Sequence, residues 1–126
     1  MNVIVVDTSA WVSYFRGIEA PDLDIALREG RVLLAPIVAA ELLSGEIPAA
    51  RERALIEFLE ELPLCDASFD HWVRVGLLRR ALRQRGVFIS TPDAHVAQCC
   101  IDVRGYLLTE DKIFRQIASA AGLRLL

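Results

Sequence analysis

The chain carries, close to its first residue, the apolar run Val3-Ile4-Val5-Val6, which ends in a carboxylate at Asp7. Four consecutive apolar residues are typical of a central strand in a parallel sheet, because helices cover both faces of such a strand. Sites in open parallel sheets lie at the carboxyl ends of the strands. The run therefore predicts a buried strand that places Asp7 at the edge where a site forms.

Strand-like and helix-like segments alternate along the whole chain. Strands are predicted at residues 3–6, 32–34, 106–108 and 123–126, with a weak one at 64–65. Helices are predicted at residues 7–15, 21–30, 36–45, 48–61, 68–84, 90–102 and 110–121. This alternation predicts an α/β fold with a central parallel sheet of about four to five strands, covered by helices on both faces. We expect one domain that spans residues 1–126.

The composition limits the possible classes of protein. The chain is 54% apolar, which is compatible with a homo-oligomer or a permanent partner that covers an apolar surface. No segment reaches the roughly 18 apolar residues of a membrane span, and no basic region precedes the first apolar run, as a signal peptide would require. Three cysteines without a C-x-x-C pair fit buried thiols in a reducing compartment. We therefore expect a cytoplasmic protein.

Four carboxylates stand where an ordinary protein would carry a neutral residue: Asp7, Glu41, Asp93 and Asp111. The three aspartates each begin an apolar stripe at helical spacing, so their side chains are expected to point inward, toward the end of the sheet. Glu41 lies in an apolar stretch, where burial of an unpaired carboxylate is costly. Four acids that converge repel one another and favour a divalent cation.

Each acid also has an ordinary structural explanation. Asp7, Asp93 and Asp111 stand near predicted helix starts, where acids cap a helix or complement its dipole. Glu41 can instead pair with an arginine, the type of 13 of the 14 basic residues. The net charge is −3 and would be +1 without the four acids, so it does not exclude RNA as a ligand.

Four segments occur in order along the chain: Val5-Val6-Asp7-Thr8-Ser9-Ala10-Trp11, Ala40-Glu41-Leu42-Leu43-Ser44-Gly45, Thr91-Pro92-Asp93-Ala94-His95-Val96-Ala97 and Leu107-Leu108-Thr109-Glu110-Asp111-Lys112-Ile113-Phe114. Together they resemble PIN-domain ribonucleases, and more closely the VapC toxins of bacterial and archaeal toxin–antitoxin pairs. The resemblance implies a PIN-like three-layer α/β/α sandwich. The sequence departs from the family at His95 and at the pair Cys99-Cys100, where small apolar residues are more usual. No role is predicted for these residues, and His71 and His95 have no partner at metal-ligand spacing.

The resemblance implies a metal-dependent endoribonuclease that hydrolyses RNA phosphodiester bonds as the toxin of a type II toxin–antitoxin pair. One or two Mg²⁺ or Mn²⁺ ions would be held, directly or through water, by Asp7, Glu41, Asp93 and Asp111. Glu110 is the alternative to Asp111. The hydroxyl groups of Ser9 and Thr109 are favoured as groups that orient a carboxylate or a metal-bound water, and Thr8 is a further choice.

The resemblance also implies partners. The protein would be a homodimer, restrained by a small antitoxin that places a basic side chain among the acids. Arg115 is the favoured RNA contact, whereas Arg79, Arg80 and Arg83 are better explained as a solvated helix face. The alternative function is a catalytically inactive PIN-like module that sequesters a protein or RNA partner, which the loss of an acid would mark. The sequence does not name the RNA or the antitoxin.

Overall fold

A computed structural model, which describes residues 2–126, has a small parallel sheet at its centre. Its strands are β1 (Ile4–Val6), β2 (Val32–Leu33) and β3 (Tyr106–Leu108), in the order β2-β1-β3. Val5 of β1 pairs with Leu33 on one side and with Leu107 on the other. The apolar run near the start of the chain therefore forms the central strand, as predicted.

Two further segments extend the sheet by a single residue each. Leu64 forms an isolated parallel bridge with Leu34, and Leu125 forms one with Leu107. The expected four to five strands are thus three strands with a one-residue bridge at either edge. The two outer segments stay short because each exchanges only two backbone hydrogen bonds with its neighbour, through Leu34 and Leu107.

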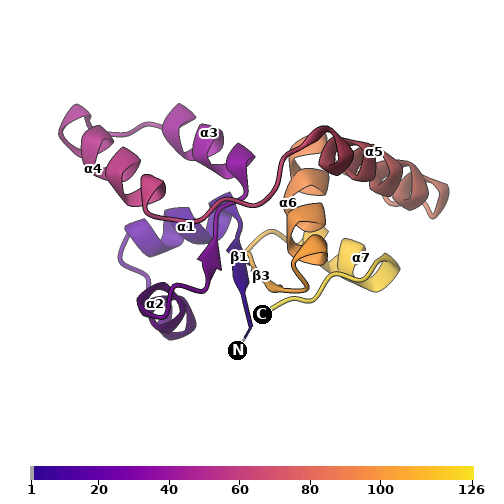
Figure 1. Cartoon of the computed structure of the whole chain (residues 1–126), viewed down its shortest axis with the longest axis horizontal. Coiled ribbons are helices and arrows are strands. Elements are labelled where there is room, and N and C mark those ends of the chain that lie inside the picture. The colour runs from indigo at the N-terminus through magenta and orange to yellow at the C-terminus, as the bar shows by residue number, and fades with distance from the viewer. Residues whose placement is uncertain (1) are drawn as a thin grey trace.

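Helices flank the strands on two sides. Figure 1 shows α1 to α4 on one side of the strands and α5 to α7 on the other. Within residues 2–126 the helices are α1 (Thr8–Phe15), α2 (Pro21–Arg28), α3 (Pro36–Ser44), α4 (Ala49–Glu60), α5 (Phe69–Gln84), α6 (Thr91–Asp102) and α7 (Ile113–Ala120). Pro21 and Pro36 occupy the first position of their helices, where the missing backbone N–H needs no partner.

The last helix begins three residues later than predicted. The Asp111 N–H donates to Thr109 Oγ1 at 3.0 Å, and the Ile113 N–H donates to Asp111 Oδ1 at 3.0 Å. Side-chain bonds of this kind offer the backbone an alternative to the helix. Glu110 and Asp111 therefore lie in a loop at the end of β3, ahead of α7.

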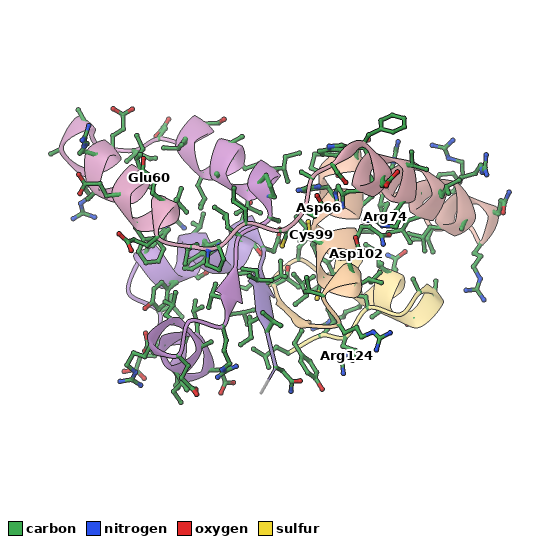
Figure 2. The ribbon with its side chains drawn as sticks, in the orientation of Figure 1. Glu60, Asp66, Arg74, Cys99, Asp102 and Arg124 are labelled. Atoms are coloured by element: carbon green, nitrogen blue, oxygen red, sulfur yellow. The ribbon has the colours of Figure 1, made fainter. Side chains whose placement is uncertain are left out.

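The core is built around β1 and α6. Val5 and Val6 of β1 are fully buried, and so is Trp11 of α1. Residues 94–100 of α6 are all buried, so this helix is enclosed on every side. An ion pair fastens α6 to α5, with Arg74 Nη2 at 2.8 Å from Asp102 Oδ2 (Figure 2). The enclosed helix begins close to Asp93 and so fixes the position of that acid.

Candidate functional site

Asp7 is a buried carboxylate at the end of β1, with only 7% of the residue exposed. It occupies the N-cap position of α1, but its side chain makes no capping hydrogen bond. Its Oδ2 atom instead accepts two hydroxyl groups, Ser9 Oγ at 3.0 Å and Thr109 Oγ1 at 2.9 Å. Both hydroxyl groups bind Oδ2, which leaves Oδ1 for an external ligand. The capping explanation therefore does not account for Asp7.

The same two hydroxyl groups join the start of α1 to the loop after β3. Ser9 Oγ accepts the backbone N–H of Glu110 at 3.0 Å and lies 3.3 Å from Thr109 Oγ1. Thr109 Oγ1 accepts the N–H of Asp111 at 3.0 Å. Each hydroxyl thus donates a hydrogen bond to Asp7 and accepts one from a backbone N–H of the loop. Residues 100 positions apart in the sequence become one hydrogen-bonded group.

Glu41 lies on α3 and is exposed, which corrects the expectation of a buried carboxylate. The helix buries Val38 and Leu42, and Glu41 projects from beside that stripe. Its Oε1 atom accepts the hydroxyl of Thr8 at 2.8 Å. Glu41 is therefore tied to the residue directly after Asp7, and no arginine pairs with it within residues 2–126.

Asp93 stands in the first turn of α6 and is half-buried. The capping role belongs to Ser90, whose Oγ atom accepts the Asp93 N–H at 3.1 Å. Burial raises the pKa of the Asp93 carboxyl, the Ser90 hydroxyl opposes that rise, and three negative charges reinforce it: those of Asp111, Asp7 and Glu41. The other three acids thus lie close enough to Asp93 for their charges to act on it.

Asp111 and Glu110 occupy neighbouring places in the loop but make different contacts. Asp111 is exposed and holds the start of α7, because its Oδ1 accepts the Ile113 N–H. Glu110 Oε1 accepts the hydroxyl of Ser13 at 2.8 Å. Of these two loop acids, Asp111 raises the pKa of Asp93 and Glu110 does not contribute. The geometry therefore favours Asp111 over Glu110 as the fourth acid of the group.

The four acids lack basic partners in the described chain, but they are not drawn together as ligands of one ion would be. Within residues 2–126 none of them forms an ion pair with a basic side chain. No three of them bring one oxygen each within 4.8 Å of one another in the described part of the chain. Mg²⁺ keeps several waters and takes one or two carboxylates directly. An acidic group of this openness fits a hydrated cation better than a dehydrated one.

The family of the chain follows from a comparison with known proteins. The family model of the PIN domain matches residues 4–120. The chain belongs to the PIN-domain family. VapC ribonuclease Mb1587 of Mycobacterium bovis and ribonuclease VapC11 of Mycobacterium tuberculosis are each 30% identical to it over 129 residues, which cover 97% of this chain and 96% of the relative.

Solved structures are similar to this PIN domain over its whole length. VapBC from Salmonella typhimurium, bound to DNA, has a TM-score of 0.81 at 19% identity and covers 100% of this chain and 98% of that one. VapBC2 from Rickettsia felis, bound to a promoter DNA fragment, has a TM-score of 0.78 at 22% identity, with 98% and 97% covered. The predicted PIN-like α/β fold is confirmed.

Arg115 lies on α7 of the PIN domain, beside the acidic loop. It is exposed and, with Thr109 and Asp111, lines a small cleft of about 140 Å³. The intrahelical salt bridge that would explain it otherwise is not formed in the described chain, since Asp111 precedes the helix. Arg79 differs, because its Nε donates to the carbonyl of Ile89 at 3.0 Å and so has a structural role.

Two contributors to the site were absent from the sequence prediction. Ser90 caps α6 and holds the turn that carries Asp93, and Ser13 binds Glu110. The Ser-Thr-Pro-Asp pattern at residues 90–93 is a helix-start signal that identifies Ser90 as the cap. No sequence signal indicates Ser13, because its partner is 97 residues away.

None of the helices in residues 2–126 has the length and apolar character that a membrane span requires.

Proposed function

We propose that this PIN domain is a metal-dependent endoribonuclease and the toxin of a toxin–antitoxin pair. The observation that carries the proposal is the buried Asp7 carboxylate, held on one oxygen by two hydroxyl groups, whose charge acts on Asp93 together with those of Glu41 and Asp111. It lies at the carboxyl end of the central strand, where sites form in parallel sheets. The VapC ribonucleases among its relatives support the same reaction.

The residues that would hold the cation are Asp7, Glu41, Asp93 and Asp111. Oxygen ligands suit Mg²⁺ or Mn²⁺, and the absence of histidine and cysteine among the four disfavours zinc. When bound, such a cation supplies an activated water and offsets the negative charge of the phosphate. Burial raises the pKa of Asp93 and the charges of Asp111, Asp7 and Glu41 add to the rise; a bound cation would offset these charges.

The remaining polar residues orient the acids. Ser9 and Thr109 fix one oxygen of Asp7 through their hydroxyl groups. Thr8 does the same for Glu41. Arg115, which lines the cleft together with Asp111, provides a positive charge for a phosphate of the RNA. Such supporting groups keep ligands in place and tune their affinity for the cation.

An antitoxin would occupy the groove between α1, α4 and the segment that joins α3 to α4. This groove has a volume of about 770 Å³ and is lined mainly by apolar residues, among them Val12, Phe15, Leu42, Leu55 and Phe58. It lies along α1, the helix that begins at Asp7, so a chain that fills the groove can extend to the acids. The similar solved structures are VapBC complexes, which supports an antitoxin as the kind of partner.

A homodimer would bury the apolar face of α5. Phe69, Trp72, Val73 and Leu77 recur at helical spacing and are 81%, 40%, 41% and 48% exposed. A stripe of this kind is unusual on a monomer and typical of an interaction surface. The substitution Leu77→Glu is expected to shift the protein from dimer to monomer in sedimentation experiments. A wild-type protein that sediments as a monomer would contradict the dimer.

The function is tested by cleavage of total RNA with purified protein, freed of any partner, in Mg²⁺ or Mn²⁺ and in EDTA. Wild-type protein is expected to produce discrete fragments only with the cation, and Asp7→Asn is expected to produce none. Asp22→Asn removes an exposed acid in the first turn of α2 and serves as the matched control, with cleavage unchanged. Cleavage by Asp7→Asn, or in EDTA, would contradict the proposal. A folded wild-type protein that binds the cation without cleaving would favour the sequestering module.

A further inference from the structure

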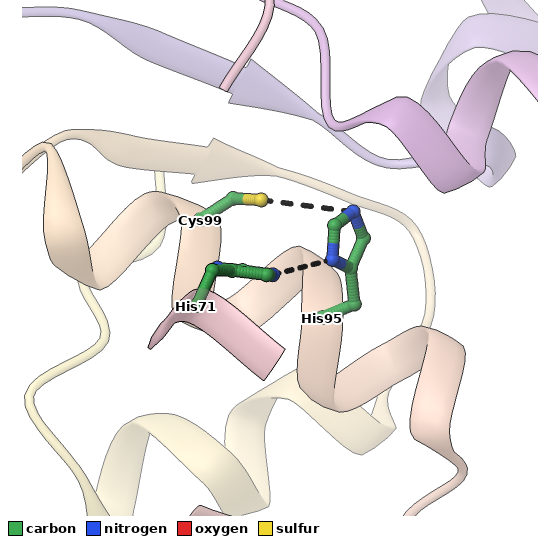
Figure 3. A group of neighbouring side chains, drawn as sticks. All are labelled: His71, His95 and Cys99. Carbon is green, nitrogen blue, oxygen red and sulfur yellow. Dashed lines mark hydrogen bonds between the residues drawn. The ribbon is translucent and has the colours of Figure 1, made fainter. Parts of the chain in front are cut away.

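A second group of possible metal ligands lies between α5 and α6. Unlike the acids, its members carry nitrogen and sulfur donors, and all of them are buried. His71 of α5 and His95 of α6 are fully buried, and His71 Nε2 lies 2.6 Å from His95 Nδ1. Cys99, one turn further along α6, has its Sγ 3.7 Å from His95 Nε2. Figure 3 shows His71 and Cys99 both directed at the His95 ring. The fold thus gives the two histidines the partners that their spacing in the sequence did not indicate.

The three side chains have the separations of ligands to one ion. One ligand atom from each lies within 4.8 Å of the others. Zinc bond lengths place a nitrogen and a sulfur about 3.6 Å apart in a tetrahedral site, close to the 3.7 Å between His95 Nε2 and Cys99 Sγ. His95 and Cys99 are also four residues apart on one helix face, a spacing that lets two side chains share a ligand. His71 Nε2 contacts His95 Nδ1 at 2.6 Å, so His71 would turn away from the His95 ring to bind the ion.

An outer carboxylate points to the same conclusion independently. His71 Nδ1 is buried without a hydrogen-bond partner, and Asp102 Oδ2 lies 3.7 Å from it. Histidines that bind a metal usually give their other N–H to a carboxylate, which fixes the tautomer. A proton on Nδ1 of His71 leaves the lone pair of Nε2 for the cluster. Asp102 is held in place by Arg74 and by Gln98, each at 2.8 Å.

Two other cysteines are buried in the same part of the fold but do not belong to the group. Cys65 follows the one-residue bridge at Leu64 and is 6% exposed, and Cys100 is fully buried, yet neither joins the ligand atoms that lie within 4.8 Å of one another. Histidine nitrogen and cysteine sulfur are usual donors for structural zinc, and the full burial of the three residues leaves no open position for a substrate.

We propose that His71, His95 and Cys99 bind one Zn²⁺ or a similar soft divalent cation in a buried structural site. The ion would join α5 to α6, and binding would release the Cys99 thiol proton to solvent. Because α6 also carries Asp93, the ion would hold the helix that presents this acid. The proposal does not depend on the ribonuclease activity, since none of its ligands belongs to the acidic site.

The test is Co²⁺ binding, followed by absorption, to the full chain after removal of metal with a chelator. Tetrahedral Co²⁺ absorbs strongly in the visible range and shows a thiolate charge-transfer band, whereas Co²⁺ on carboxylates and water absorbs weakly. Wild-type protein is expected to bind one tetrahedral Co²⁺ per chain. Cys99→Ala is expected to lose the thiolate-dependent spectrum, and Cys100→Ala, its buried neighbour, and Asp93→Asn are both expected to keep it.

The wild-type spectrum decides the proposal even if Cys99→Ala does not fold, which circular dichroism would show. A wild-type protein without the tetrahedral and thiolate bands would overturn the proposal. It would also be overturned if folded Cys99→Ala kept the full spectrum. Native mass spectrometry provides an independent measurement: one Zn²⁺ retained per chain at equimolar metal is expected, and none retained would contradict the site. A protein that binds Zn²⁺ without cleaving RNA would overturn the proposed function alone.

Discussion

The acidic site and the histidine–cysteine cluster share α6 but have opposite chemistry. Asp93 stands in the first turn, half-buried, and its acidic neighbours Glu41 and Asp111 are exposed. His95 follows two positions later and is fully buried with Cys99. Oxygen ligands at an open edge suit a cation that exchanges water and substrate, whereas nitrogen and sulfur ligands in the core suit one that stays. Position along one helix thus separates a site for chemistry from a site for stability.

The largest expected effect is on RNA cleavage, which a substitution in the acidic site should abolish and a substitution in the histidine–cysteine cluster should not. Asp93→Asn should reduce RNA cleavage below detection, because a half-buried acid of the cation group is lost. Cys99→Ala should retain cleavage per folded molecule, because its side chain does not reach the acids. Cleavage rates normalised to the folded fraction measure both. Loss of activity in folded Cys99→Ala would contradict the claim that the two sites act separately.

The buried histidines should make stability sensitive to acid. Burial, reinforced by the charge of His71, lowers the pKa of His95 to about 4 from its ordinary value of about 6.5. Between these values the unfolded chain takes up a proton that the folded chain refuses, so the free energy of unfolding falls as the pH falls. The expected loss is on the order of 3 kcal/mol.

Urea unfolding of the chelated protein at a series of pH values measures this loss. His95→Gln is the comparison variant, and it should have a smaller dependence on pH over the same window. An equal dependence in the wild-type protein and the variant would assign the effect to other groups.

Thr109→Val should have an intermediate effect on the acidic site. The substitution keeps the shape of the side chain but removes the hydroxyl that donates to Asp7 and accepts from Asp111. Outer partners of this kind are worth roughly 10–100-fold in metal affinity or activity. Cleavage rates measured across a Mn²⁺ titration separate a loss of metal affinity from a loss of activity at saturating metal. Ser119→Ala, which removes a hydroxyl bound only to the Arg115 carbonyl, should leave the titration unchanged.

The smallest effect concerns the repulsion among the acids. Asp93 has a raised pKa in the folded state, so the free energy of unfolding falls as the pH rises from its unfolded pKa to its folded one. At neutral pH, Asp93→Asn should therefore stabilise the chelated protein, by roughly 0.2–1 kcal/mol because solvent screens a half-exposed group. Thermal unfolding in EDTA measures the gain, and saturating Mg²⁺ should reverse the order of the two proteins.

Much of the fold could be predicted because local signals agree with the tertiary structure. The apolar run before Asp7 indicated the central strand, and prolines and glycines marked most helix boundaries. The start of α7 could not be predicted, because the hydrogen bonds of Thr109 and Asp111 compete with the helix. The outer strands were overestimated, since segments 64–65 and 123–126 pair at one residue each.

The site was predictable in its residue types but not in its contacts. Asp7, Asp93 and Asp111 were chosen from their places after strands and at helix starts, and Glu41 from the apolar stretch around it. In the structure the charges of the other three acids act on the pKa of Asp93. The exposure of Glu41 was not foreseen, because the apolar stretch around it hid which helix face is buried. His71 and His95 are 24 positions apart and lie on different helices, and no spacing rule indicates that they are in contact.

The most direct test of the account is a crystal structure with Mn²⁺, located by its anomalous scattering. The account predicts a peak among Asp7, Glu41, Asp93 and Asp111, with water completing the coordination and Oδ1 of Asp7 facing the ion. It also predicts that Asp7→Asn crystals lack this peak. Density for Mn²⁺ elsewhere in the protein, with none among the four acids at saturating metal, would contradict the central claim.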